Sequence, residues 1–379
     1  DMPISFTELA NAPDWLSIHV LLNGEKFSLS SGTILQFKRE LDLRTGVLSR
    51  TVQWRSPGGY VATLKFERFA SLADEHLLCV RCQVTPEFDG QVEFRAALNG
   101  NTDNEGLTHW RWMGQTLHIL EQDQQVVHLH NRTRKTGIDL ILAMRLLASS
   151  DHQAEYWDVE NVPTLRQVFS ARCGEPVTMT KLVGIATSRD TDTPLALALE
   201  RVVKPQSWDE ALEAQKQAWA QEWKRTDVVI EGDDEAQIAV RFSLFQLLIA
   251  APRTDSRVNI GAKTLSGFGY RGHAFWDTEI YMLPVFIYTA PHIARNLLDY
   301  RYLTLNAARA KAREFGYEGA WFAWESADTG EDVTPTWVPD FKDKKKLARV
   351  WTGDLAIHIS ADVAYGTYQY WRATGDDVW

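Results

Sequence analysis

The period of the apolar residues changes once along this 379-residue chain, near residue 200. Before that point apolar and polar residues alternate in short runs, as in 60–69, and turn sequences such as Asn23-Gly24 separate the runs. Alternation with period two is typical of strands that bury one face, and many short strands indicate a sandwich of antiparallel sheets. After residue 200 the apolar residues recur at helical spacing. The sequence therefore predicts an α+β fold, with a β-sandwich followed by helices.

The segment between the two parts is predicted to be a helix that packs on the sandwich. Ser207 and Glu210 form a capping box, and the apolar residues that follow share one side of the helix. These residues are Trp208, Leu212, Trp219 and Trp223. The predicted domains are a sandwich over 1–200, a helical linker over 201–233 and a helical domain over 234–379.

Five helices are predicted after the linker. Residues 236–251 are apolar nearly all round, so we expect this helix to be buried on more than one side. Gly316 and Gly375 are expected to end two of the others. Long Gly- and Trp-rich segments separate the helices, and loops of that length usually carry function. The remaining helices are expected at 277–288, 291–303, 304–315 and 357–374.

The cysteines indicate core thiols rather than a metal or redox site. Cys79 and Cys82 have the spacing of a zinc or redox pair, but they lie in the alternating run 77–84. Positions three apart on a strand point to opposite faces, so the two thiols are expected to be unable to share a metal or a disulfide. With Cys173 they are also too few to crosslink a chain of this length.

The charge balance excludes some classes of partner. Lysine and arginine number 40 against 50 aspartates and glutamates, a formal net charge of −10, which argues against binding a nucleic acid. No run of 18 apolar residues is present, and the acidic opening segment 1–14 lacks the layout of a signal peptide. We therefore expect a soluble, cytoplasmic protein with no membrane partner.

Two loop segments place an indole next to a carboxylate. Trp276-Asp277 stands at the start of a predicted helix, and Trp324-Glu325 lies in a second Gly-rich segment. A pyranose ring stacks on an indole while its hydroxyls donate to a carboxylate, so the pattern indicates a shared sugar-binding pocket. The alternative is structural, with Asp277 as a helix N-cap and Trp276 as a core residue.

The segments Gly269–Glu279, Trp324-Glu325-Ser326 with Gly330-Glu331, and His358–Tyr365 resemble glycoside hydrolase family 65. The resemblance extends over nearly the whole chain. It implies an N-terminal β-sandwich, a helical linker, an (α/α)6 catalytic barrel and a small C-terminal sheet domain. On this comparison the sandwich lacks its N-terminal part, and residues 234–379 are the first part of a truncated barrel.

The resemblance also implies roles for six residues. Arg271 and Asp277 would bind hydroxyls of the non-reducing glucose, Trp276, Trp324 and Glu325 would line the same subsite, and Ser360 would stand where the family has a small residue. The general acid of the family is a glutamate in a motif that residues 1–379 do not contain. No catalytic residue is therefore expected in this chain, and the acid is expected beyond Trp379.

The family comparison predicts cleavage of an α-glucosidic bond with inversion. Phosphorolysis of a disaccharide to β-glucose 1-phosphate is the leading hypothesis, with inorganic phosphate as co-substrate and no cofactor. An inverting hydrolase of the same family is the alternative, and a non-catalytic sugar-binding protein is the second alternative. His273 and Asp277 have a metal-like spacing, but the family uses no metal and none is expected. A homodimer is a further option.

Overall fold

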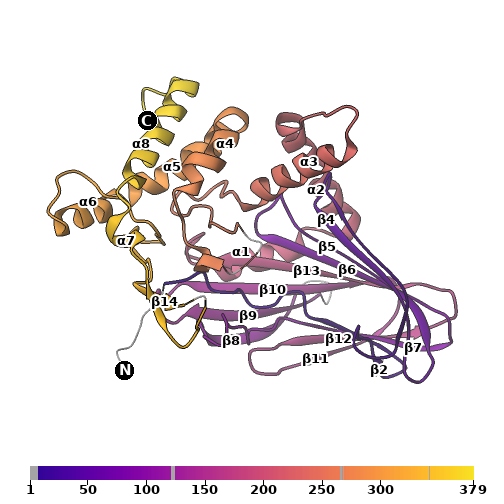
Figure 1. Cartoon of the computed structure of the whole chain (residues 1–379). Helices are drawn as coiled ribbons and strands as arrows, with labels where there is room; N and C mark the ends of the chain where they lie inside the picture. The colour runs from indigo at the N-terminus through magenta and orange to yellow at the C-terminus, as the bar shows by residue number, and fades with distance from the viewer. Residues whose placement is uncertain (1–6, 121–123, 265–266, 268, 341) are drawn as a thin grey trace. The chain divides into compact units, whose positions relative to one another are not determined.

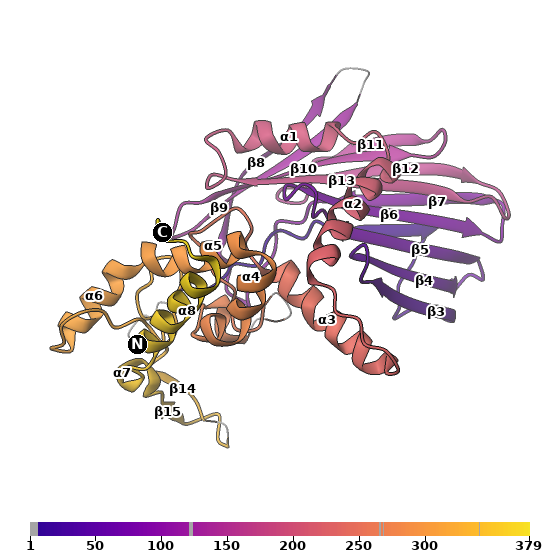
Figure 2. The same ribbon diagram turned by 90° about the horizontal axis from the view of Figure 1, so that it is seen from above.

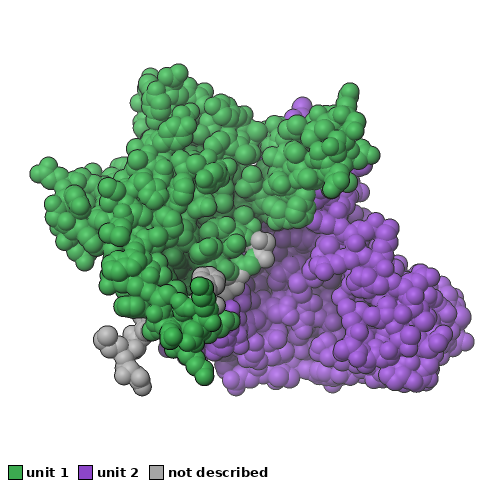
Figure 3. Space-filling view, in the orientation of Figure 1, with its two compact units in different colours: residues 1–9, 225–379 green, residues 10–224 purple. Residues whose placement is uncertain are grey.

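The computed structural model describes residues 7–120, 124–264, 267, 269–340 and 342–379. The opening residues 1–6, part of the segment examined for a signal peptide, lie outside the described residues. The chain forms two compact units, one of residues 10–224 and one of residues 225–379 together with 1–9 (Figure 3). Among the described helices, none is both long and apolar enough to cross a membrane.

The unit of residues 10–224 contains two antiparallel sheets (Figure 1). Eight strands in the order β3-β4-β5-β6-β13-β10-β9-β8 form the larger sheet, and five in the order β11-β12-β7-β1-β2 form the smaller one. Their inner faces enclose one apolar core, so the predicted β-sandwich is confirmed. The strands are β1 Ile18–Leu22, β2 Glu25–Lys26, β3 Thr33–Asp42, β4 Val47–Arg55, β5 Val61–Ala70, β6 Leu77–Pro86, β7 Gly90–Ala97, β8 Trp110–Ile119, β9 Gln125–Thr133, β10 Asp139–Ala148, β11 Gln153–Trp157, β12 Thr164–Ala171 and β13 Val177–Thr187.

The two cysteines of β6 lie on opposite faces of the larger sheet. Cys82 belongs to the core between the sheets, whereas Cys79 belongs to a second apolar cluster on the outer face. Both are free, and burial raises the pKa of the Cys79 thiol to about 12. The prediction that these are core thiols is confirmed.

Two helices cover the outer face of the larger sheet. They are α1 (Pro194–Val203) and α2 (Trp208–Thr226). A Cβ on Gly184 of β13 would lie 2.1 Å from the carbonyl oxygen of Ala198, so only glycine allows α1 to lie this close. Trp208 packs edge-on against Phe69 of β5, with ring centroids 5.1 Å apart. The prediction that the tryptophan stripe packs on the sandwich is confirmed.

The unit that contains residues 225–379 is largely helical (Figure 2). Its helix α5 has the predicted bounds, and Gly316 and Gly375 follow α6 and α8 with positive φ. One expectation is wrong, because α3 buries only Phe245 and Leu248, whereas Ile238 is 64% exposed. The apolar residues of α3 surround the helix, but other described elements cover only one side of it. The elements are α3 Asp234–Ala250, the turns η2 Gly269–Gly272 and η3 Thr278–Met282, α4 Leu283–Thr289, α5 Pro291–Leu303, α6 Leu305–Glu314, β14 Trp337–Pro339, β15 Leu347–Arg349, α7 Thr352–Leu355 and α8 Ile359–Thr374.

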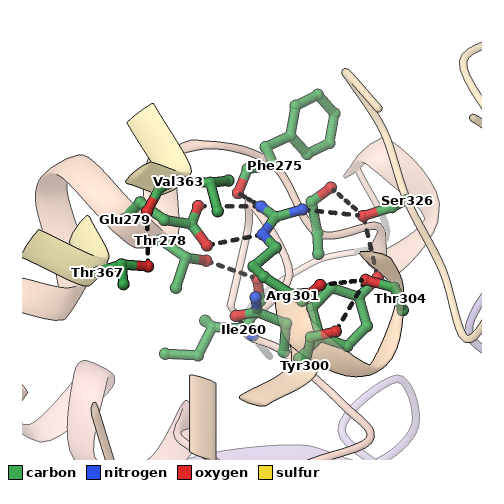
Figure 4. A network of polar contacts seen from close by, with 12 residues as sticks. Ile260, Phe275, Thr278, Glu279, Tyr300, Arg301, Thr304, Ser326, Val363 and Thr367 are labelled. Carbon is green, nitrogen blue, oxygen red and sulfur yellow. Dashed lines mark hydrogen bonds and ion pairs between the residues drawn. The ribbon is translucent and has the colours of Figure 1, made fainter. Parts of the chain in front are cut away.

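A buried ion pair joins these helices to the loops between them (Figure 4). Arg301 of α5 donates to both carboxylate oxygens of Glu279, at 2.7 and 2.9 Å, and the two side chains are 3% and 1% exposed. The same guanidinium donates to the carbonyl oxygen of Phe275 at 2.9 Å and to Ser326 Oγ at 3.4 Å. Burial acts to lower the pKa of Arg301, but the Glu279 carboxylate outweighs it and the net shift is upward.

A lysine crosses the core of the sandwich. Lys181 of β13 is fully buried, and its Nζ donates to the carbonyl oxygens of Ala97, at 2.7 Å, and Ser17, at 3.2 Å. Burial lowers the pKa of Lys181 to about 7, although the charge of Asp14 opposes the shift. Among the described residues, no carboxylate forms an ion pair with this ammonium group.

The Lys181 pKa predicts how stability depends on pH. Between pH about 7 and the pKa of an unfolded lysine, about 10.4, the unfolded chain keeps a proton that the folded chain has released. Stability should therefore rise with pH in this range, by at most about 1.4 kcal/mol per pH unit from this one group. We expect the Lys181→Met variant to lack this rise when urea unfolding is measured between pH about 7 and about 8.5.

Lys38→Met is the matched control, because Lys38 is an exposed lysine of the same unit. It should keep the pH dependence of the wild-type protein. Equal slopes for wild type and Lys181→Met would show that the buried lysine remains charged throughout.

For the Glu279–Arg301 pair, we expect that removing one partner destabilises the protein more than removing the charges of both. Arg301→Met leaves the Glu279 carboxylate buried without its cation and should lower the free energy of unfolding by about 3–5 kcal/mol. The double variant Glu279→Gln/Arg301→Met should recover part of that loss, because no charge remains buried. Urea unfolding measures both, with the exposed Arg309→Met as control. A single variant no less stable than this control would contradict the assignment.

Candidate functional site

The two segments that pair an indole with a carboxylate lie side by side. The backbone N–H of Ala274 donates to the carbonyl oxygen of Ser326 at 2.9 Å, and Ser326 returns a hydrogen bond of 3.0 Å. Further bridges join Ala274 to Gly261 and Ser326 to Asp332. This ladder connects positions about 50 residues apart and brings both predicted segments to one place.

Both predicted sugar platforms contact the same imidazole ring. Trp276 and Trp324 lie 5.3 and 6.0 Å from His358, in edge-on arrangements of 85° and 67°. Phe275 supports Trp324 from another side at 5.9 Å. Both indoles are half-buried, so part of each remains accessible. The structure therefore brings the three predicted segments together around His358, at the start of α8.

Asp277 begins an unusual turn without capping it. The five residues of η3 form a π-helical turn. This conformation is rare in proteins as a whole, and where it does occur it is often at a functional site. Asp277 occupies the N-cap position, but its side chain accepts no hydrogen bond there, so the expected side-chain cap is not formed. Its half-buried carboxylate has no hydrogen-bond or ion-pair partner in the part of the chain that the structure describes. The group can therefore accept hydrogen bonds from a ligand.

Glu325 is held in place by His273. The two side chains are buried, and His273 Nδ1 lies 2.7 Å from Glu325 Oε2. The other ring nitrogen, Nε2, lies 2.5 Å from the carbonyl oxygen of Thr7, which can only accept. Nε2 therefore donates to this carbonyl oxygen, and Nδ1 forms a hydrogen bond with the Glu325 carboxyl group. His273 thus positions the Glu325 side chain.

Arg271 lies in a strained turn beside the N-terminal segment. Tyr270 and Arg271 have φ of 59° and 54°, in the left-handed region that non-glycine residues rarely adopt. The backbone N–H of Leu9 donates to the carbonyl oxygen of Arg271 at 2.9 Å, and Arg271 Nε lies 3.9 Å from Glu8 Oε2. Strain of this kind persists where surrounding contacts enforce it and is concentrated at functional sites.

Ser360 holds the second loop through its hydroxyl. Ser360 Oγ accepts from the backbone N–H of Phe322 at 3.2 Å and lies 3.0 Å from the carbonyl oxygen of Ala320, to which it donates. Its place in the subsite stays a prediction, and in this structure the hydroxyl is bonded to the backbone of the segment that carries Trp324.

Residues that the sequence did not single out position the site. Arg301 shares a helix face with Leu297, four positions earlier. A charged residue on that apolar face was the sequence feature that could have indicated a buried ion pair. Lys311, on the buried face of α6, pairs with Asp332, whose Oδ2 also accepts from the backbone N–H of Trp324 at 3.3 Å. Nothing in the local sequence indicated the His273–Glu325 pair, since its members are 52 positions apart.

Comparisons with known proteins agree over both parts of the chain. Residues 1–222 match the model of the glycosyl hydrolase family 65 N-terminal domain, and residues 241–379 match the model of the family 65 central catalytic domain. A kojibiose phosphorylase of Halothermothrix orenii is 38% identical over 97% of this chain and 49% of its own length. An alpha,alpha-trehalose phosphorylase of Thermoanaerobacter brockii is 34% identical over 97% of this chain and 47% of its own.

A solved structure, named as a candidate kojibiose phosphorylase from the human microbiome, has the same fold. It superposes with a TM-score of 0.85 at 24% identity and covers 99% of this chain and 49% of that one. The chain spans about half the length of the curated relatives that it matches. With both domain models matched in order and the sandwich followed by helices, the chain belongs to glycosyl hydrolase family 65.

Proposed function

We propose that the complete protein is an inverting phosphorylase of an α-linked glucose disaccharide. The observation that carries the proposal is the Asp277 carboxylate, which has no partner among the described residues and adjoins Trp276. A carboxylate next to an accessible indole suits a pyranose, whose hydroxyls donate while its apolar face stacks. The relatives named above are phosphorylases, which supports phosphate as the second substrate.

The described residues would bind the non-reducing glucose. Asp277 and Arg271 would contact its hydroxyls, and Trp276 and Trp324 would pack against its ring. Glu325 would accept further hydroxyl hydrogen bonds from a position that His273 determines. These groups orient the sugar and exclude water from its surface, which is the part of catalysis that depends on positioning.

The chemical step would need a general acid and a bound phosphate in addition to these sugar contacts. A general acid would protonate the glycosidic oxygen while a phosphate oxygen attacks the anomeric carbon from the opposite face. The bond to the leaving sugar breaks as the bond to phosphate forms, and the product is β-glucose 1-phosphate. We expect the acid beyond Trp379, as the family resemblance implies.

The proposal predicts phosphate-dependent consumption of a disaccharide. The complete protein would be incubated with kojibiose, maltose, nigerose or trehalose, with and without inorganic phosphate. We expect one of these sugars to be consumed only with phosphate, and the anomeric proton of the product in an NMR spectrum to identify β-glucose 1-phosphate. Glucose release without phosphate would instead make the protein a hydrolase, and binding without turnover would make it a sugar-binding protein.

The subsite assignment predicts that Asp277→Ala lowers kcat/KM of the complete enzyme by at least about tenfold. The substitution removes a charge-assisted contact worth about 1.5–3 kcal/mol or more. kcat/KM for the preferred disaccharide measures the loss. Glu314→Ala, which removes an exposed carboxylate at the end of α6, is the matched control and should retain activity. Wild-type kcat/KM in the Asp277→Ala variant would contradict the assignment.

A further inference from the structure

Three arginines lie on one face of the larger sheet, where Arg50 and Arg68 are half-buried and Arg39, on the edge strand β3, is exposed. The register places Arg39 of β3 directly opposite Arg50 of β4, and Arg50 opposite Phe66 of β5. Arg68, two positions after Phe66, lies on the same face of the sheet. This face is the one that carries the core residue Cys82. Inner faces of sandwiches are normally apolar, and like charges directly opposite each other are destabilising.

These arginines line a pocket near the edge of the larger sheet, where β3, β4 and β5 lie side by side (Figure 2). The pocket has a volume of about 290 Å³. Its other walls are apolar, and Phe66 lies beneath the Arg50 guanidinium at 4.5 Å. The apolar lining residues are Leu16, Ile18, Leu29, Phe37, Leu48, Phe66 and Val80.

The positive charge in the pocket is not neutralised by the protein. Across the described ranges, none of the three side chains forms an ion pair or hydrogen bond, and the buried Nε of Arg50 has no partner. Two other arginines of the sandwich do have carboxylate partners: Arg81 pairs with Glu67 and Arg132 with Asp139, each at 2.7 Å. Burial, followed by the nearby arginines, lowers the pKa of Arg68, although Asp14 weakly opposes this.

We propose that this pocket binds a small phosphate-bearing ligand, either inorganic phosphate or a sugar phosphate. A phosphate dianion neutralises two of the three charges and accepts from several guanidinium groups at once, whereas one carboxylate would neutralise a single charge. The volume is at the lower end of the range for ligand pockets, about 300–1,000 Å³, and suits a small ligand. The residues of this site are all in the sandwich, so the proposal is independent of the phosphorylase function.

The experiment is hydrogen–deuterium exchange on the complete protein. Inorganic phosphate and glucose 1-phosphate are the two probes, and sodium chloride at matched ionic strength is the reference for non-specific screening. We expect slower exchange in peptides covering β3, β4 and β5, with saturation at millimolar ligand. Stronger protection by glucose 1-phosphate would identify the sugar phosphate as the ligand, and equal protection would identify the phosphate group alone.

Two variants connect the protection to the arginines. Arg50→Met and Arg68→Met should each weaken the apparent affinity for phosphate about tenfold or more, because each removes a charge-assisted contact. Both should also raise the melting temperature of the ligand-free protein, since a half-buried cation without an ion-pair partner is removed. This second measurement separates loss of binding from loss of folding.

Lys38→Met is the matched control. Lys38 precedes Arg39 on β3, points to the opposite face and pairs with Glu40 at 2.8 Å. It should leave phosphate protection unchanged. The proposal would be overturned by absence of protection, by equal protection from sodium chloride, or by full protection in Arg50→Met. Because the readout is local to these strands, it stands whether or not the protein proves to be a phosphorylase.

Discussion

The ion pair between Glu279 and Arg301 is the interaction on which the helical unit depends. Two charges removed from water are stable only when every donor and acceptor around them is satisfied. Here the guanidinium also bonds to the carbonyl oxygen of Phe275 and to Ser326. Its partners come from the loop before η3, from η3 itself and from the second loop. One side chain of α5 thus connects both segments that carry the candidate sugar contacts (Figure 4).

A second set of contacts supports the groups that would contact the ligand. His273 hydrogen-bonds to Glu325 and donates to the carbonyl oxygen of Thr7, and Asp332, which pairs with Lys311, accepts from the backbone N–H of Trp324. These residues need not touch a sugar to matter, because a loop supplies accurate geometry only when packed side chains and hydrogen bonds hold it. Asp277 is the exception, since its carboxylate remains without a partner in the described chain. The site therefore combines side chains that are fixed by hydrogen bonds with one carboxylate, that of Asp277, which can accept hydrogen bonds from a ligand.

The sandwich also contains both a charged group that the protein itself satisfies and charged groups that have no partner. Burying the charged form of Lys181 in the core costs free energy, and this cost falls when the amine loses its proton. Two carbonyl oxygens accept hydrogen bonds from the same amine. Arg39, Arg50 and Arg68 have no such internal partners among the described residues, although they lie on the same face of the sheet. Apolar residues in place of the half-buried Arg50 and Arg68 would remove two unpaired cations from this face. The cations are accounted for if a ligand supplies the missing negative charge.

The sequence alone determined the features that depend on a single element or on local chemistry. Alternation predicted the strands and placed Cys79 and Cys82 on opposite faces, the tryptophan stripe predicted how α2 packs, and the motifs around Asp277 and Glu325 indicated the family. Only the tertiary structure decided that α3 buries one side, that His273 hydrogen-bonds to Glu325, and that Arg301 bonds to two loops. Periodicity reports which face of an element is apolar, whereas the partner of a buried charge lies tens of residues away and is chosen by packing.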